Sequence, residues 1–478
     1  MSQDLLLELS KNPTASKLIK NLGLPIPMPI VLRRAKGPMA ARPLADLNVV
    51  VASGPNATLT ATLARDLAEA GANPLVHSST DIAPFKGPGE AFGRPAVAVS
   101  NDDAKQHRAH GFVFDATGVA TVAELRSIYD FFQPWLRSLG RNGRVVVIGR
   151  PADTVKGAEA AAAQAALEGF VRSISKEVSE LGATANGLFV EAGAEARVAG
   201  PLRYLLSERS VYMNGQPMIV RAEVKGSEAP RWERALDGKV ALVTGAARGI
   251  GEQIARLMAD EGAHVVVLDR PNDEELATRV ARSIGGSTLL LDITAPDAPA
   301  QIAEHFKAKF GGIDLVVHNA GVTRDKTLKN MKPEYWDQAV DINLGAVIRI
   351  NDTLISSGAL RDNARIVCLS SVSGIAGNRG QTNYSAAKSG LISYVQELGH
   401  QLAASGGTVN AIAPGFIETR LTAAMPVANR EVARRMNSLG QGGQPEDVAQ
   451  AVMFLTTPGS AGVTGNTIRV CGGMLIGA

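Results

Sequence analysis

The stretch 371–388 contains three side chains whose types and spacing suit acid–base chemistry. Tyr384 and Lys388 lie four residues apart in an Ala/Ser-rich segment that predicts a helix, which places both on one face, one turn apart. An ammonium group close to a phenol favours the phenolate, so we expect Lys388 to lower the pKa of Tyr384 from about 10 and to make it a general acid/base. Ser371 follows the apolar run 365–369 and is expected at the carboxyl end of a strand, where open α/β sheets bind ligands.

A glycine-rich turn lies between the strand-like run 239–243 and a predicted helix. Gly245 permits the tight turn, Gly249 lets the backbone approach a pyrophosphate, and Gly251 allows close packing of the helix on the strand. Asp269 ends the next predicted strand, eighteen residues after Gly251, where a carboxylate would bind a ribose 2′-hydroxyl. This order of elements predicts a dinucleotide-binding site.

The choice between NADH and NADPH depends on two residues of opposite charge. Asp269 is expected to accept a hydrogen bond from the ribose of NADH and to repel the 2′-phosphate of NADPH. Arg248, in the glycine-rich turn, favours NADPH because its guanidinium group could pair with that phosphate. We expect the carboxylate to be the closer group, so the sequence predicts NADH, with NADPH as the less favoured alternative.

Other small or polar residues end or interrupt predicted elements of the same half. Asn319, Ala320 and Gly321 end a strand, and their small size would let the adenosine half of a cofactor lie against the chain. Asp292 is a candidate adenine contact, with an ordinary helix N-cap as the alternative. Asn343 lies within a predicted helix, where it either satisfies nearby backbone groups or holds a water for proton delivery.

Length and composition limit the classes of protein that fit. The 478 residues suffice for two or three domains, and 45% hydrophobic residues with only 4% aromatic residues and 49 glycines suit an α/β protein. The net charge of +3 gives no reason to expect nucleic acid or an anionic membrane as a partner. No apolar run approaches the ~18 residues of a membrane span and residues 1–20 lack the core of a signal peptide, so we expect a soluble, cytoplasmic protein. Cys368 and Cys471 predict no disulfide framework, and no pattern predicts a metal site.

Alternating strand-like and helix-like segments predict two parallel-sheet units, at 46–220 and 237–478. Residues 221–236 are charged, lack an apolar period and are predicted to be a linker. Residues 1–45 are predicted to be an arm with a short helix and several prolines. We expect it to pack across the first unit, with partner binding as the alternative.

The two units align with each other as copies. The segments that end near residues 78 and 269 align with an offset of 191 residues, and the offset rises along the chain to 250 between 214–220 and 464–470. A rising offset is what a shorter copy produces, so we infer an internal duplication. The expected fold class is therefore α/β, with two tandem Rossmann-like, doubly wound parallel sheets, the first of them degenerate and flavodoxin-like.

The first copy lacks the residues that suit chemistry in the second. Gly249 and Gly251 correspond to Thr58 and Thr60, whose Cβ atoms would block close approach of a pyrophosphate. The counterparts of Asp269, Asn319, Ser371, Tyr384 and Lys388 are Ser78, Ala116, Arg150, Ala160 and Gln164. We therefore expect the first copy to be without activity and to give structural support.

The elements TGxxxGxG, NAG, a helical Asn, Ser and YxxxK follow one another between Thr244 and Lys388. In this order they resemble the short-chain dehydrogenase/reductase family, and the resemblance covers 237–478 nearly end to end. GNRGQTNYSAAKSG at 377–390 is similar to the subset that reduces 3-oxoacyl thioesters, the 3-oxoacyl-[acyl-carrier-protein] reductases. The doubled architecture resembles the actinobacterial high-molecular-weight form of that subset.

The resemblance implies NADH-dependent reduction of 3-oxoacyl thioesters of acyl carrier protein or coenzyme A to 3-hydroxyacyl thioesters, within fatty-acid metabolism, by a homodimer or homotetramer. Tyr384 would protonate the carbonyl oxygen, and Ser371 would hydrogen-bond it. Lys388 would lower the pKa of Tyr384 and hold the nicotinamide ribose, and Asn343 would steady a water that resupplies the proton. The residues implied to contact the cofactor are Gly245, Arg248, Gly249, Ile250, Gly251, Asp269, Asp292, Ile293, Asn319, Ala320, Gly321, Tyr384, Lys388, Pro414, Gly415, Ile417 and Thr419.

The region 415–462, which the first copy lacks in part, is expected to form a lid over the substrate. Within it, Arg430, Arg434 and Arg435 are expected to form a basic edge for coenzyme A phosphates or an acidic carrier protein, with a solvated helix face as the alternative. Two other functions stay open. They are a short-chain alcohol dehydrogenase for another ketone or hydroxy substrate, such as a steroid or sugar, and a non-enzymatic nucleotide-binding scaffold.

Overall fold

The computed structural model describes residues 4–12, 14, 28–226 and 229–474. Short apolar runs form its strands, because a strand of a parallel sheet is covered on both faces and needs no polar alternation. The first sheet contains β1 (Asn48–Ser53), β2 (Asn73–His77), β3 (Val97–Val99), β4 (Ala109–Asp115), β5 (Leu139–Gly149), β6 (Thr184–Val190) and β7 (Pro217–Val220). The second contains β8 (Val240–Thr244), β9 (His264–Asp269), β10 (Ser287–Leu290), β11 (Ile313–His318), β12 (Leu360–Leu369), β13 (Thr408–Pro414) and β14 (Thr467–Val470).

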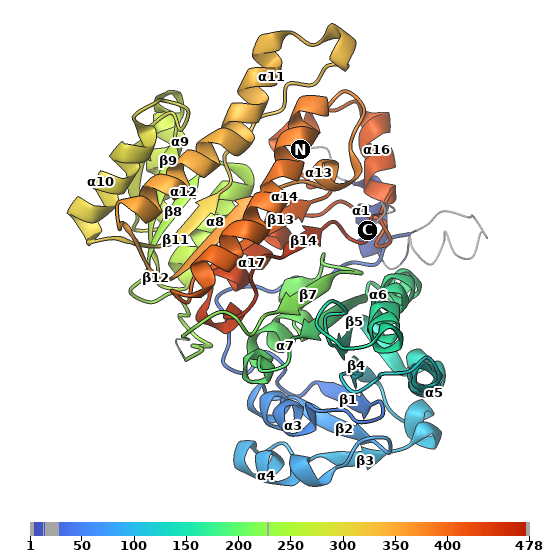
Figure 1. Ribbon diagram of the computed structural model, residues 1–478. Coiled ribbons are helices and arrows are strands. Elements are labelled where there is room, and N and C mark those ends of the chain that lie inside the picture. Colours follow the sequence, from blue (N-terminus) through green and yellow to red (C-terminus); the bar gives the residue numbers. More distant parts are fainter. Residues whose placement is uncertain (1–3, 13, 15–27, 227–228, 475–478) are drawn as a thin grey trace.

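Helices cover both faces of each sheet (Figure 1). An N-terminal helix, α1 (Leu5–Lys11), precedes the first sheet. The first copy then has α3 (Thr60–Glu69), α4 (Ala83–Phe92), α5 (Arg126–Trp135), α6 (Ala158–Val178) and α7 (Ala199–Leu206). The second has α8 (Gly249–Asp260), α9 (Glu274–Ser283), α10 (Ala298–Phe310), α11 (Pro333–Val340), α12 (Ala346–Ser356), α13 (Val372–Ala376), α14 (Thr382–Ala403), α15 (Arg420–Ala423), α16 (Val427–Arg435) and α17 (Pro445–Thr456).

Both sheets are seven-stranded and parallel, with the orders β3-β2-β1-β4-β5-β6-β7 and β10-β9-β8-β11-β12-β13-β14. The copies share local irregularities as well as order. Asn142 and Asn363 are equivalent residues in β5 and β12, and both adopt a left-handed backbone, with φ of 56° and 59°. The prediction of two tandem Rossmann-like sheets is therefore confirmed, and the shared order and irregularities agree with the inferred internal duplication.

The two copies pack against each other through equivalent elements. Tyr204 of α7 stacks on Phe454 of α17, its counterpart at the 250-residue offset, with ring centroids 4.4 Å apart and planes within 7°. Gln216 and Asn466 are also equivalent, and each hydrogen-bonds the backbone of the last strand of the other copy. A continuous cluster of buried apolar residues crosses this contact. The halves thus form an internal pseudo-dimer with an isologous interface.

The N-terminal arm packs on the first copy as expected, where Arg33 N donates to Asn142 Oδ1 at 3.0 Å, and it also contacts the second copy. Arg34 forms a bidentate ion pair with Asp447 of α17, at 2.8 and 2.9 Å. Gln441 donates from Nε2 to the carbonyl oxygen of Ile30 at 2.8 Å. The predicted short helix is present as α1, and the prolines at 25 and 27 lie outside the described residues.

The expected lid at 415–462 proves too long. Every residue from Asp447 to Thr456 of α17 is buried, and this helix has a counterpart, α7, in the first copy. It is therefore a core helix, which the sequence pattern did not distinguish from an insertion. The part that the first copy lacks is the segment 415–444, with α15 and α16, and we call it the lid segment.

Several features bear on the class of protein. Among the described residues, none of the helices combines the length and apolarity needed to span a membrane. Cys368 and Cys471 are both buried free thiols. No group of His, Cys, Asp and Glu side chains within the described ranges is arranged to hold a metal ion.

Candidate active site

The carboxyl end of β12 and the first turns of α14 bring the predicted acid–base residues together. Ser371 caps α13 and accepts a hydrogen bond from Ser373 N at 3.1 Å. The Lys388 ammonium nitrogen lies 5.6 Å from the centroid of the Tyr384 ring. It donates to the carbonyl oxygen of Leu369 at 2.6 Å, and this bond fixes α14 against the end of β12.

The pKa of Tyr384 is shifted in the direction opposite to the one expected from the sequence. Burial of the phenol raises its pKa above the usual value, although a hydrogen bond with Ser371 lowers it in part. Burial also lowers the pKa of Lys388 to about 8. Lys388 does not favour the phenolate here because its ammonium group lies over the ring face and is bonded to a backbone carbonyl. Tyr384 is therefore protonated at neutral pH, as a proton donor must be.

Asn343 lies in a π-helical turn, Asp341–Gly345, between α11 and α12. Such turns are frequent at functional sites. Its Nδ2 donates to the carbonyl oxygens of Ala339 and Val322, at 2.7 and 2.9 Å. Its buried Oδ1 has no hydrogen-bond partner among the described residues. Asn343 therefore satisfies nearby backbone and still offers an acceptor that fits a water.

Gly321 shows what this acceptor faces. A Cβ atom built on Gly321 would lie 2.6 Å from Asn343 Oδ1 and 3.5 Å from Lys388 Nζ. The amide oxygen and the ammonium group thus border one small space beside Gly321. A glycine is required there, since any side chain would fill that space.

A crevice at the carboxyl end of the second sheet fits the adenosine half of a dinucleotide. Gly245 and Gly249 have left-handed φ angles of 64° and 62°, which favour glycine. Asn319 Nδ2 donates to the carbonyl oxygens of Thr244 and Gly245, both at 3.0 Å, and so braces the glycine turn. The crevice is lined by Gly245, Arg248, Leu268, Asp269, Arg270, Leu291, Asp292, Ile293, Asn319, Ala320, Gly321, Val322 and Ile342.

The predicted cofactor residues that do not line this crevice lie beside it. Gly249, Ile250 and Gly251 form the first turn of α8, whose N-terminus a pyrophosphate would meet. Asp292 lines the crevice and also accepts hydrogen bonds from Thr294 N and Oγ1, at 2.9 and 2.7 Å, so both of its predicted roles fit. Pro414 ends β13, and Gly415, Ile417 and Thr419 follow it in the segment 415–444, where Ile417 forms an isolated β-bridge with Gly443.

The charged residues around Asp269 include two that the sequence reasoning missed. Asp269 Oδ2 accepts from Ala247 N at 3.0 Å, which holds the carboxylate at the end of β9. Arg248 is paired with Asp273 at 2.9 Å, and Arg270 is paired with the same carboxylate at 3.2 Å. A basic residue directly after Asp269 was the available signal for Arg270. Nothing in the local pattern marks Asp273.

The corresponding edge of the first copy is closed by side chains. Arg150, the counterpart of Ser371, donates to Thr58 Oγ1 at 2.9 Å and to Glu195 at 2.8 Å. A Cβ atom on Gly118, the counterpart of Gly321, would lie only 2.1 Å from the carbonyl oxygen of Asn56. The turn that would cradle a pyrophosphate thus rests directly on the next strand end.

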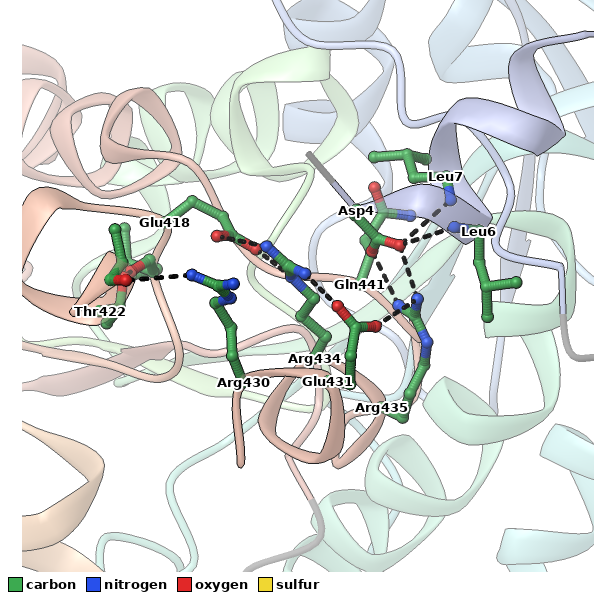
Figure 2. Close-up of polar contacts among 12 residues, drawn as sticks. Asp4, Leu6, Leu7, Glu418, Thr422, Arg430, Glu431, Arg434, Arg435 and Gln441 are labelled. Atoms are coloured by element: carbon green, nitrogen blue, oxygen red, sulfur yellow. Dashed lines mark hydrogen bonds and ion pairs between the residues drawn. The ribbon is translucent and has the colours of Figure 1, made fainter. Parts of the chain in front are cut away.

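The arginines of α16 do not form the expected basic edge. Arg434 is 1% exposed and pairs with Glu418, through two contacts of 2.5 and 2.9 Å, and with Glu431. Arg430 is buried and donates to the carbonyl oxygen of Ala423. Arg435 binds Asp4 of the arm. Figure 2 shows these side chains directed into the chain, so the prediction of a free phosphate-binding edge is wrong.

Comparisons with known proteins agree with this geometry. The family model described as enoyl-(acyl carrier protein) reductase matches residues 245–475. The 3-oxoacyl-[acyl-carrier-protein] reductase FabG of Vibrio cholerae is 39% identical over 241 residues, which cover 50% of this chain and 98% of the relative. FabG of Escherichia coli is 40% identical over 240 residues (50% and 98%), and FabG of Thermotoga maritima is 41% identical over 244 residues (50% and 99%).

The chain belongs to the short-chain dehydrogenase/reductase family. Membership implies a nicotinamide cofactor, and the crevice at the end of the second sheet fits one. These matches cover about half of the chain, so they leave the first copy and the arm without a counterpart.

Proposed function

We propose that the second copy reduces 3-oxoacyl thioesters of acyl carrier protein or coenzyme A to 3-hydroxyacyl thioesters, with NADH as the reductant. The observation that supports it most is that the Ser371 hydroxyl lies close enough to Tyr384 to lower its pKa. Lys388, on the same helix as Tyr384, lies beside Gly321 of the dinucleotide crevice. Two hydroxyl donors at one point suit a ketone oxygen, which must gain a proton during reduction. The FabG relatives bear the name of this reaction.

The residues of this chain would have the following roles in the reaction. A bound nicotinamide supplies the hydride that the carbonyl carbon takes up. Tyr384 donates its phenolic proton to the carbonyl oxygen, and Ser371 donates a hydrogen bond to the same atom. Lys388, released from Leu369, would bind the nicotinamide ribose and stabilise the phenolate left behind. A water held on Asn343 Oδ1 would return a proton through Lys388.

An activity screen tests this proposal against its alternatives. NADH should be consumed with acetoacetyl-CoA far faster than with an uncharged ketone of similar size. Consumption only with the uncharged ketone would instead support a short-chain alcohol dehydrogenase for another substrate. NADH binding without turnover of any ketone would support a nucleotide-binding scaffold, against which the intact Ser371, Tyr384 and Lys388 set argues.

The preference for NADH is proposed from the charges around the ribose. Asp269 is held where a 2′-phosphate would be repelled, and Asp273 engages the two guanidinium groups that could attract it. Asp273→Asn should free Arg248 and Arg270 and raise kcat/KM for NADPH about 5-fold, the scale of one exposed charge contact. Asp260→Asn, an exposed position at the end of α8, is a matched control for net charge. A wild-type preference for NADPH, or no change in Asp273→Asn, would show that Arg248 dominates.

A single dinucleotide site per chain is also expected. The first copy has Arg150 in place of Ser371 and a closed glycine turn, so only the second copy can accept a pyrophosphate. Titration calorimetry with NADH should therefore give about one site per chain. Two sites of similar affinity would mean that the turn at Asn56 opens and that the first copy is functional.

The assembly and location of the chain remain proposals of the same kind. We expect the protein to lie in the cytoplasm. We also expect a homodimer or homotetramer, and sedimentation of the full-length chain would test this assembly. A monomer at micromolar concentration would contradict this expectation.

A further inference from the structure

The lid helix α16 is fastened to the N-terminus of the chain. Both terminal nitrogens of Arg435 contact the carboxylate of Asp4, with Nη2–Oδ1 and Nη1–Oδ2 distances of 2.6 and 2.8 Å (Figure 2). The Asp4 side chain is 6% exposed and that of Arg435 is 20% exposed. A bidentate pair sheltered from water in this way is stronger and more directional than an ordinary surface pair.

Asp4 also organises the helix to which it belongs. Its Oδ1 accepts hydrogen bonds from Leu6 N and Leu7 N, at 3.1 and 3.2 Å, so it is the N-cap of α1. Burial raises the pKa of Asp4, but the hydrogen bonds from Arg435 and Leu7 N–H outweigh it and hold the pKa below its usual value. The carboxylate is thus charged at neutral pH and joins the start of α1 to the end of α16.

The two sides of α16 differ in polarity. The charged side faces the chain, where Arg434 is bonded to Glu418 and Arg435 to Asp4. The opposite side is apolar and open, since Val432 is 58% exposed and Met436, four residues on, is 45% exposed. The charged contacts therefore set the direction in which the apolar stripe of the lid points.

The arm that carries Asp4 is itself anchored at the base of the lid. Ile30 accepts a hydrogen bond from Gln441, which lies six residues beyond the end of α16. Tyr212, from the first copy, donates its hydroxyl to the carbonyl oxygen of Gln441 at 2.7 Å. Arg34 is paired with Asp447 at the start of α17. The C-terminal end of the segment 415–444 is thus tied to the N-terminal arm and to the first copy.

We propose that α1 is a positioning element of the active site, in which Asp4 holds Arg435 and so fixes the lid segment over the edge that binds the acyl thioester. The inference rests on the proposed function for the identity of the substrate. It also gives the N-terminal arm and the first copy a role in the reaction of the second.

We call the ion pair between Asp4 and Arg435 the latch. Asp4→Asn tests it without unfolding α1, because asparagine is an equally good N-cap and only the charge is lost. Hydrogen exchange of the peptide amides of 427–435 should become about 10-fold faster, as expected when one partner of a sheltered ion pair is removed. KM for acetoacetyl-CoA should rise about 5-fold with kcat within about 2-fold, since the lid would be misplaced while the chemistry is intact. NADH affinity should change less than KM for acetoacetyl-CoA, because no residue of α16 lines the crevice for the adenosine half.

Two further variants complete the experiment. Glu8→Gln is the matched control, since it removes an exposed pair with Lys11 on the same helix and touches no residue of α16. Arg435→Gln should have effects at least as large as those of Asp4→Asn, because Arg435 also contacts Gly440 O and Glu431. The double variant should be no worse than Arg435→Gln alone, because the Asp4–Arg435 contact is then already lost. Additive effects would contradict a direct latch.

The outcomes separate the latch from the proposed function. Unchanged exchange of α16 in Asp4→Asn would overturn the latch, whatever the enzyme reduces. Faster exchange with an unchanged KM would show that the latch exists but does not position the lid for substrate, and would overturn the inference. Failure of the wild-type chain to reduce acetoacetyl-CoA would overturn the proposed function alone, since the exchange comparison would still decide the latch.

Discussion

Replacing Tyr384 with phenylalanine is expected to lower kcat for acetoacetyl-CoA reduction by about 10²–10⁴-fold, the usual scale for loss of a general acid. The ring packing is retained, so the loss should come from the missing proton and not from folding. Burial raises the pKa of Tyr384, and the phenol is therefore the protonated group in contact with Ser371 at neutral pH. Steady-state kinetics with saturating NADH would measure the effect.

Tyr394→Phe provides the matched control on the same helix. Its hydroxyl accepts from Asn351 and lies ten residues beyond Tyr384, away from the dinucleotide crevice. This variant should keep turnover within about 3-fold of wild type, as expected for loss of one weak internal hydrogen bond. Near-normal turnover in folded Tyr384→Phe would remove the assignment of the proton donor.

Gly251→Ala should weaken NADH binding by about 10–100-fold, the effect of overpacking by one methyl group. The added Cβ atom would lie 2.3 Å from the carbonyl oxygen of Gly245 and 2.5 Å from Asn319 Nδ2. The first atom belongs to the turn that a pyrophosphate must approach and the second braces that turn, so the turn has to move. Fluorescence titration with NADH would measure the affinity.

Gly169→Ala serves as the control for that substitution, since a Cβ atom there meets nothing within 4 Å and the residue lies within α6. Its NADH affinity should equal that of wild type. Equal affinity in Gly251→Ala would show that the glycine turn tolerates a side chain, and it would weaken the argument that Thr58 and Thr60 disable the first copy.

The fold was predictable because its signals are local and repeated. Apolar runs of strand length alternate with helical segments twice, and the rising offset between the copies reveals their relation. The helix α17 was the exception. Its buried residues are needed for a contact with the first copy, through Phe454 and Tyr204, and no pattern within 445–456 shows that partner.

The site was predictable in its residues and less so in their electrostatics. The spacing of Tyr384 and Lys388 correctly placed them on one helical face, but spacing does not report burial, which moves both of their pKa values. The prediction for the arginines of α16 was wrong for a related reason. Arg435 meets Asp4, which lies 431 residues away, and sequence periodicity contains no information on such a partner.

The most direct test of the account uses two thioesters in one reaction. The family model carries the name of an enoyl reductase and the FabG relatives that of 3-oxoacyl reductases, so the product distinguishes the two chemistries. The wild-type chain would be incubated with NADH and equal amounts of acetoacetyl-CoA and crotonyl-CoA, and the products identified by mass spectrometry. The account predicts 3-hydroxybutyryl-CoA, because Ser371 and Tyr384 deliver a proton to oxygen. Accumulation of butyryl-CoA, with acetoacetyl-CoA left unreduced, would contradict it.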